Sequence, residues 1–238
     1  MTTRLDLGGI SVDVVFKDIK NVHLSVYPPT GRVRISAPTR MKLDTVRVFA
    51  IAKLDWIKEH RHKLRKQERE TPREYLDRES HYLWGKRYLL KISESDEAPS
   101  VEVKGKHLVL RVRPGADEQK KRELVEEWYR EQIKEAVPAM IAKWERRMGV
   151  KVARVFVQRM KTKWGSCNSG SHSIRLNTDL AKKPLECVEY VVVHEMAHLL
   201  VRHHDDRFRS VMDECLPNWR QLQQMLNSAP LAHSDWAY

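Results

Sequence analysis

The segment that most constrains this chain is VVVHEMAHLLVRHHD, residues 191–205, because it places four histidines and a glutamate in an apolar run. Pro184 suits the first turn of a helix, and no glycine or proline follows for about 19 residues, so we expect one continuous helix. At about 100° per residue, His194, Glu195 and His198 share one arc, and apolar residues fill the rest. Such a helix should be buried, and buried imidazoles and carboxylates are costly unless they are paired or bind a metal.

The spacing H-E-x-x-H offers a chemical reason for these polar groups. Two imidazoles one turn apart can bind one zinc ion, with the glutamate beside the metal, where it can take a proton from the zinc-bound water. We therefore expect His194 and His198 as zinc ligands and Glu195 as the general base. The bare pentapeptide also occurs by chance on core helices, so the surrounding sequence has to support this interpretation.

The third zinc ligand must come from outside the pentapeptide, because catalytic zinc usually has three protein ligands and one open position. His204 stands ten residues after His194, which is the separation in the HExxHxxGxxH pattern. We predict His204 as the third ligand. His203 is the alternative histidine, and a carboxylate such as Glu214 is the alternative of another type.

The turn after the helix departs from that pattern, because Val201 stands where the glycine would be. Without glycine the chain must turn in another way, and we expect the helix to end near Arg202. The next helix should then be capped by Asp205 or Asp206.

The remaining sequence predicts an α+β fold. Alternating apolar residues and turn signals indicate a mainly antiparallel β region over residues 1–114, with one helix beginning near Asp44. Residues 115–238 should form a zincin-like metallohydrolase region, in which the H-E-x-x-H helix lies beside a β-sheet. The first helix of this region should reach Gly149 and be kinked or divided at Pro138.

The composition of the chain indicates which partners it attracts and in which compartment it is expected. Lysine and arginine number 44 against 32 aspartates and glutamates, and the resulting net charge of +12 should attract phosphates, nucleic acids or acidic surfaces. No apolar run approaches the roughly 20 residues of a membrane span, and the first residues lack the apolar core of a secretory signal. The three cysteines stand far apart, so we expect reduced thiols. These features predict a cytoplasmic protein that does not bind membranes.

Several motifs follow one another along the chain. They are RMKTKWGSC at 159–167, IRLN at 174–177, HEMAHL at 194–199, His204, Phe208 and PNW at 217–219. GRVRISAP, DWI and WGKRYLL precede them in the N-terminal half. In this combination the chain resembles the YgjP-like metallopeptidases, which are related to the SprT-like and minimal gluzincin-type peptidases, and the resemblance covers nearly the whole chain.

The resemblance implies a zinc metallopeptidase. It implies His194, His198 and His204 as zinc ligands and Glu195 as the catalytic acid and base. It also implies a strand beside the site, here SIRLNTDL, that could hold an extended peptide substrate through main-chain hydrogen bonds. Manganese, cobalt or nickel could occupy such a site in vitro.

Two other functions remain open. The same metal site could attack a phosphoanhydride, with Arg159, Lys161 and Lys163 neutralising phosphates, and the resemblance also implies nucleotide phosphohydrolase activity. Against this, the chain has no Gly-rich phosphate loop and no acidic cluster for magnesium. Alternatively, the basic helix expected at 58–73 could recruit the hydrolase to DNA or RNA, although no nucleic-acid-binding motif is visible.

Some roles in the site are not assigned by the sequence. The group that stabilises the oxyanion could be His203, His172, Lys163 or Arg175, which all lie near the motifs in sequence. Cys167 has His172 five residues later, but spacing along a loop does not establish a thiol nucleophile. A role for Cys167 in shaping the strand near the metal is the simpler interpretation. The oligomeric state is not predicted.

Overall fold

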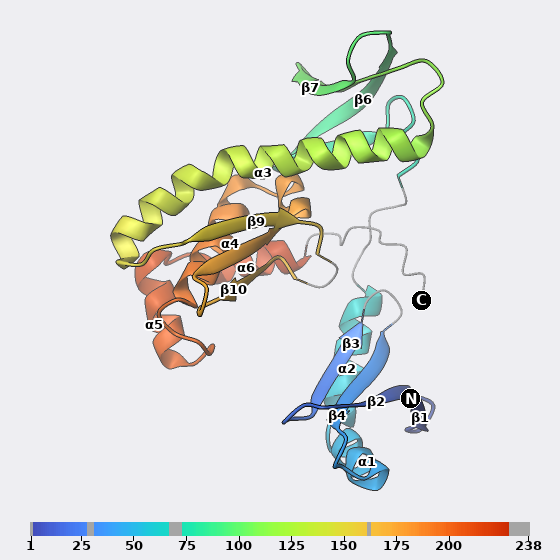
Figure 1. Ribbon diagram of the computed structural model, residues 1–238, viewed down its shortest axis with the longest axis vertical. Helices are drawn as coiled ribbons and strands as arrows, with labels where there is room; N and C mark the ends of the chain where they lie inside the picture. Colours follow the sequence, from blue (N-terminus) through green and yellow to red (C-terminus); the bar gives the residue numbers. More distant parts are fainter. Residues whose placement is uncertain (1, 28–30, 67–72, 161–162, 229–238) are drawn as a thin grey trace. The chain divides into compact units, whose positions relative to one another are not determined.

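The computed structural model describes residues 2–27, 31–66, 73–160 and 163–228 of the chain (Figure 1). The chain divides into two compact units, one within residues 1–70 and the other within residues 71–233. The boundary expected near residue 115 falls inside the second unit. No helix among the described residues is both long enough and apolar enough to cross a membrane.

The first unit contains a four-stranded sheet. Its strands are β1 (Thr2–Asp6), β2 (Ser11–Lys17), β3 (His23–Tyr27) and β4 (Arg32–Pro38), in the order β1-β2-β4-β3. The β1–β2 and β3–β4 pairs are antiparallel, as expected, but β2 and β4 run parallel. The sheet is therefore mixed, because its central pair joins strands that are not neighbours in sequence.

Two helices follow this sheet where the sequence predicted one. They are α1 (Leu43–Ala52) and α2 (Leu54–Lys66). The break lies at Lys53, whose amide donates to the Ala50 carbonyl at 3.2 Å, a tighter bond than the α-helical one. Val46, Ala50 and Ile57 are buried in a small core with the sheet. Residues 67–72 of the basic stretch expected at 58–73 lie outside the described residues.

The second unit begins with another four-stranded sheet. Its strands are β5 (Ser80–Leu83), β6 (Lys86–Glu94), β7 (Ser100–Lys104) and β8 (His107–Val112), in the order β5-β6-β8-β7. The two predicted hairpins, β5–β6 and β7–β8, are present, and β6 and β8 run parallel. Trp84 and Gly85 turn the first hairpin with φ values of 51° and 77°. Their amides donate to the carbonyls of Ala181 and Lys182 at 2.8 and 3.3 Å.

Helix α3 (Glu118–Met148) spans this unit and continues through Pro138 without being divided (Figure 1). The Asp117 side chain caps its first turn by accepting from the Lys120 amide at 2.8 Å, and Gly149 ends it with φ of 67°. Its buried residues recur every three or four positions; they are Val125, Tyr129, Ile133, Val137, Ile141 and Trp144.

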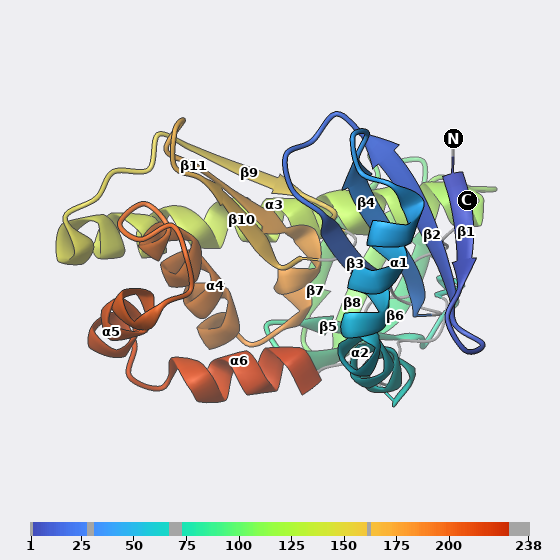
Figure 2. The same ribbon diagram turned by 90° about the horizontal axis from the view of Figure 1, so that it is seen from below.

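The remaining elements surround the H-E-x-x-H segment. A third sheet contains β9 (Arg154–Gln158), β10 (Gly165–Asn168) and β11 (Ser173–Asn177), in the order β10-β11-β9. The short 3-10 helix η1 (Thr178–Lys182) then leads to α4 (Leu185–Ala197), α5 (Asp206–Cys215) and α6 (Trp219–Ser228). Figure 2 shows α4 between this sheet and α6. This arrangement is the predicted α+β fold.

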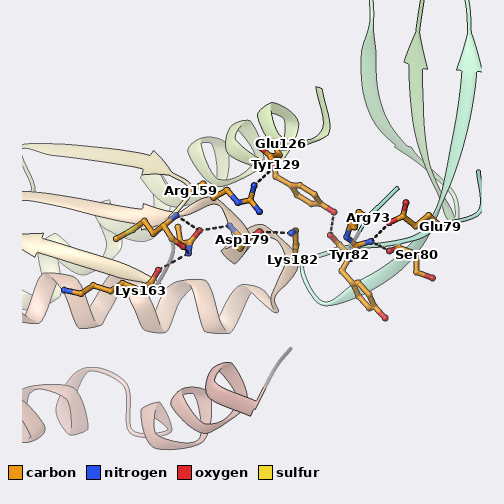
Figure 3. A network of polar contacts seen from close by, with 12 residues as sticks. Arg73, Glu79, Ser80, Tyr82, Glu126, Tyr129, Arg159, Lys163, Asp179 and Lys182 are labelled. Atoms are coloured by element: carbon orange, nitrogen blue, oxygen red, sulfur yellow. Dashed lines mark hydrogen bonds and ion pairs between the residues drawn. The ribbon is translucent and has the colours of Figure 1, made fainter. Parts of the chain in front are cut away.

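A polar network fixes η1 against its neighbours (Figure 3). Asp179 forms an ion pair of 2.6 Å with Lys182, whose ammonium lies 5.5 Å from the centre of the Tyr129 ring on α3. The Tyr129 hydroxyl donates to the Tyr82 carbonyl of β5 at 2.8 Å. The segment that leads into α4 is thus held by both the hairpin and α3.

Candidate metal centre and active site

Helix α4 is buried, as predicted, but shorter than predicted. Nine of its 13 residues are buried, and it ends at Ala197 instead of near Arg202. The amides of Leu199 and Leu200 donate to carbonyls only three residues earlier, both at 3.0 Å. This tight turn ends the helix beside His198.

Three imidazoles converge at this turn. The Nε2 atoms of His194 and His204 lie 3.0 Å apart, and one ligand nitrogen from each of His194, His198 and His204 lies within 4.8 Å of the others. Ligand nitrogens around a tetrahedral zinc, at bonds of about 2.0–2.1 Å, are about 3.3 Å apart. The three histidines could therefore hold one metal ion. The described part of the chain contains no other such group.

Val201 helps to orient His198. The Val201 amide donates to the Ala197 carbonyl at 2.9 Å, and the Val201 carbonyl lies 3.1 Å from His198 Nδ1. Because a carbonyl only accepts, Nδ1 carries the proton and the Nε2 lone pair remains available to a metal. The chain makes this contact without the glycine of the HExxHxxGxxH pattern.

Phe208 forms an apolar wall for the three imidazoles. Its ring centre lies 5.0, 4.8 and 4.7 Å from those of His194, His198 and His204, and the side chain is 2% exposed. The Asp205 side chain accepts from the Phe208 amide at 3.0 Å and caps α5. Of the two capping residues that the sequence predicted, Asp205 is therefore the one that caps this helix. This cap fixes the start of α5 beside His204.

The two alternative third ligands lie elsewhere. His203 and Glu214 are exposed, and neither belongs to the converging group. Tyr190, which the sequence reading did not single out, contacts the His194 ring edge-on at 5.8 Å and hydrogen-bonds Gln223 of α6. Its position four residues before His194, on the same face of the helix, was the available signal.

Burial shifts the pKa values of Glu195 and His194. It raises the pKa of Glu195 to about 7, and Lys163 opposes this shift. Burial, with the neighbouring His198 and His204, lowers the pKa of His194 to about 4. His194 is therefore neutral near pH 7, as a metal ligand must be.

The converging histidines and Glu195 line a pocket of about 790 Å³. Strand β10 forms one wall through Gly165, Ser166, Cys167 and Asn168, and α4 and α6 contribute others. Of the four oxyanion candidates, Lys163 and Arg175 line the pocket, whereas His203 and His172 do not. His172 Nδ1 instead donates to the Lys151 carbonyl at 3.1 Å.

Cys167 faces Glu195, and its thiol is held in the protonated form, which is not nucleophilic. Burial, together with the Glu195 carboxylate, raises the pKa of its thiol to about 11. A reactive thiol needs a lowered pKa, and His172 is engaged with Lys151. The role of Cys167 in shaping the strand beside α4 is the better supported of the two interpretations.

The strand with a free edge at the pocket is β10, not the strand expected from the sequence. SIRLNTDL contains β11, which pairs with β10 on one side and β9 on the other. Within the described residues β10 pairs with β11 alone, so its outer edge is available. The strand suggested by the family resemblance is therefore corrected from β11 to β10.

Asn177, at the end of β11, holds the segment that leads into this wall. Its side chain donates to the carbonyls of Met160 and Lys163 at 2.8 and 2.9 Å and accepts from the Met160 amide at 3.3 Å. Asn177 is 5% exposed, so these bonds are shielded from water. The sequence analysis included Asn177 only as the last residue of the IRLN motif and gave it no role.

Of the cations proposed for phosphate binding, the two that the structure describes do not both line the pocket. Arg159 pairs with Glu126 of α3 at 2.8 Å and is not part of the pocket wall (Figure 3). Lys161 lies outside the described residues, and Lys163 lines the pocket.

Comparison with known proteins gives one family. The family model described as YgjP-like, metallopeptidase domain, matches residues 20–229. No curated protein matches significantly. Two solved structures of metallopeptidase zymogens are similar: abylysin of Pyrococcus abyssi, at 17% identity and a TM-score of 0.36, and jannalysin of Methanocaldococcus jannaschii, at 17% and 0.33. The matched regions cover 38% and 40% of this chain and 90% and 92% of the abylysin and jannalysin chains. TM-scores this low support no argument about function.

Proposed function

Because the chain belongs to the YgjP-like metallopeptidase family, we propose that it is a zinc-dependent peptidase with His194, His198 and His204 as zinc ligands and Glu195 as general base. The family implies a metal ion and a peptide substrate; the choice of zinc and the residue roles are our proposal. The observation that carries it is the convergence of three imidazole nitrogens within 4.8 Å beside a buried carboxylate in one pocket.

The donor set favours zinc. Three neutral imidazoles suit zinc, and three protein ligands leave the fourth position of a tetrahedral site open. When bound there, zinc would lower the pKa of a water molecule and polarise the substrate carbonyl. His198 is oriented for this role by the Val201 carbonyl, and the ring of Phe208 excludes water from one side of the ligands.

The position of Glu195 supports a role as proton carrier. It follows His194 on the same helix, and its side chain lines the pocket. We assign it to take a proton from the attacking water and return it to the leaving amine. The free edge of β10 is suited to bind an extended peptide through main-chain hydrogen bonds. Lys163 and Arg175 are the two oxyanion candidates that remain.

The test compares zinc-loaded wild type with Glu195→Gln on an unbiased peptide library, analysed by mass spectrometry. Glu195→Gln should retain zinc and lose turnover by at least about a hundredfold, because it removes the base and keeps the ligands. Chelation should abolish wild-type cleavage, and zinc should restore it. The absence of zinc-dependent peptide cleavage from the wild type would contradict the proposal.

A panel of nucleoside triphosphates belongs in the same experiment. Hydrolysis that depends on Glu195, without peptide cleavage, would replace the peptidase by a nucleotide phosphohydrolase. Nucleic-acid association stays a prediction from net charge, and the salt dependence of DNA and RNA binding tests it.

A further inference from the structure

Three cations line the pocket beside the converging histidines. Lys163 precedes β10, Arg175 lies on β11, and Arg202 lies in the turn after α4. Arg175 is the register partner of Ser166, so the two share the face of the sheet opposite to that on which Gly165 meets Glu195, and both still line the pocket. The positive groups thus come from both the sheet side and the turn side of the pocket.

Several lysines and arginines of this unit pair with carboxylates, as in Lys143–Glu189 at 2.6 Å and Lys151–Glu145 at 3.0 Å, and others form no ion pair among the described residues. Among the described residues, Lys163, Arg175 and Arg202 form no ion pair. The Arg175 guanidinium lies 5.3 Å from the centre of the Phe156 ring, a contact that orients it and leaves its charge uncompensated.

Among the described residues, the pocket wall contains one carboxylate, Glu195, and these three cations. Concave positive walls concentrate anions, and a divalent metal ion would add to the same field. Arginine forks bind carboxylates through paired hydrogen bonds. Because β10 also presents a free edge, the fitting ligand is an extended chain that carries carboxylates.

We infer that the substrate is a peptide with acidic side chains in the bound segment, recognised by Lys163, Arg175 and Arg202. This inference rests on the proposed peptidase function and names its substrate class. Neutral and basic peptides should be poorer ligands, because they leave the three cations without partners in a site that the peptide partly desolvates.

Binding tests the inference separately from turnover. Zinc-loaded Glu195→Gln protein is titrated at near-physiological salt with two labelled peptides. One contains Asp and Glu, and the other has Asn and Gln at the same positions. We expect the acidic peptide to bind at least about tenfold more tightly. Arg202→Gln and Arg175→Gln, made in the same background, should each reduce this preference by weakening binding of the acidic peptide.

Arg209→Gln is the matched control. Arg209 is an exposed arginine of α5 that pairs with Asp206 outside the pocket, so its loss changes net charge equally and should keep the preference. Arg202 is also exposed, so its substitution tests the inference even if Arg175→Gln disturbs the Phe156 contact.

The outcomes separate the two proposals. Equal affinity for both peptides, or a preference that persists in Arg202→Gln and Arg175→Gln, would overturn the acidic-substrate inference. Wild-type cleavage without acidic preference would also overturn it and leave the peptidase standing. Acidic binding that depends on the two arginines, without any peptide cleavage, would support the subsite and contradict the proposed reaction. Displacement of the acidic peptide by a nucleoside triphosphate that the wild type hydrolyses would assign the cations to phosphate instead.

Discussion

Gly165 and Glu195 lie so close that no side chain fits between them. A Cβ built on Gly165 would lie 2.6 Å from Glu195 Oε1, 2.8 Å from its Cγ and 2.9 Å from Val191 Cγ1. The φ of Gly165 is not positive, so the requirement for glycine here is one of space. Strand β10 can therefore approach the carboxylate that we assign as general base only because its first residue has no side chain.

Gly165→Ala should displace either β10 or Glu195. Displacements of about 1 Å can cost a hundredfold in rate, so we expect kcat to fall by roughly ten- to a hundredfold while bound zinc is retained. Steady-state kinetics and metal analysis of the same preparation check this. Gly170→Ala is the control, because its Cβ would meet only Asn168 Oδ1, at 3.5 Å. Wild-type kcat in Gly165→Ala would refute the spatial role.

The sequence predicted which histidines converge better than it predicted the elements around them, and the difference follows from the range of the interactions. His194 and His198 are one helical turn apart, so local spacing was enough to bring them together. The end of α4 at Ala197, with the tight turn over Leu199 and Leu200, is not marked by a glycine or proline in the sequence.

The sheets illustrate the same limit. Apolar alternation located the strands, but the parallel pairs β2–β4 and β6–β8 and the edge position of β10 depend on contacts between segments distant in sequence. The grouping of the pocket cations could not be predicted from the sequence either, because Arg175 and Arg202 are 27 positions apart along the chain.

Removing His204 should weaken metal binding more than removing its neighbour. His204→Ala takes away one of three converging nitrogens, so we expect zinc affinity to fall by more than the ten- to hundredfold typical of an outer-shell substitution. His203→Ala, which removes an exposed imidazole outside the group, should bind zinc like the wild type. Competitive titration with a chromophoric chelator measures both. Greater loss in His203→Ala would reverse our ligand assignment.

Asp205 and Asp206 provide a second matched pair. Asp205→Ala removes the cap of α5 and should cost about 1 kcal/mol in the free energy of unfolding. Because this cap fixes the residues after His204, zinc affinity should fall as well. Asp206→Ala loses an exposed ion pair with Arg209 and should cost less than about 1 kcal/mol, with unchanged zinc affinity. Denaturant unfolding of the chelated proteins and zinc titration test the pair; equal effects would contradict the capping role.

His81 should make stability depend on pH. It is 1% exposed on β5, and neither ring nitrogen has a hydrogen-bond partner among the described residues. Arg73 and Lys182 repel its charged form, and the Glu79 carboxylate is 4.0 Å away. Burial, assisted by the two cations, lowers the pKa of His81 from 6.5 to about 3.

The lowered pKa fixes the sign of the effect. Between pH 6.5 and 3 the unfolded chain binds a proton at His81 that the folded chain does not, so acid favours unfolding. His81 should not affect the pH dependence of stability above about pH 6.5, and below that pH it should lower stability by on the order of 1 kcal/mol per pH unit down to about pH 3. His81→Leu should flatten that decline, whereas His107→Leu, which removes an exposed histidine of β8, should not. Urea unfolding at pH 4, 5, 6 and 7, with chelator throughout, measures the slopes; equal slopes in the wild type and His81→Leu would show that His81 is not buried in its neutral form.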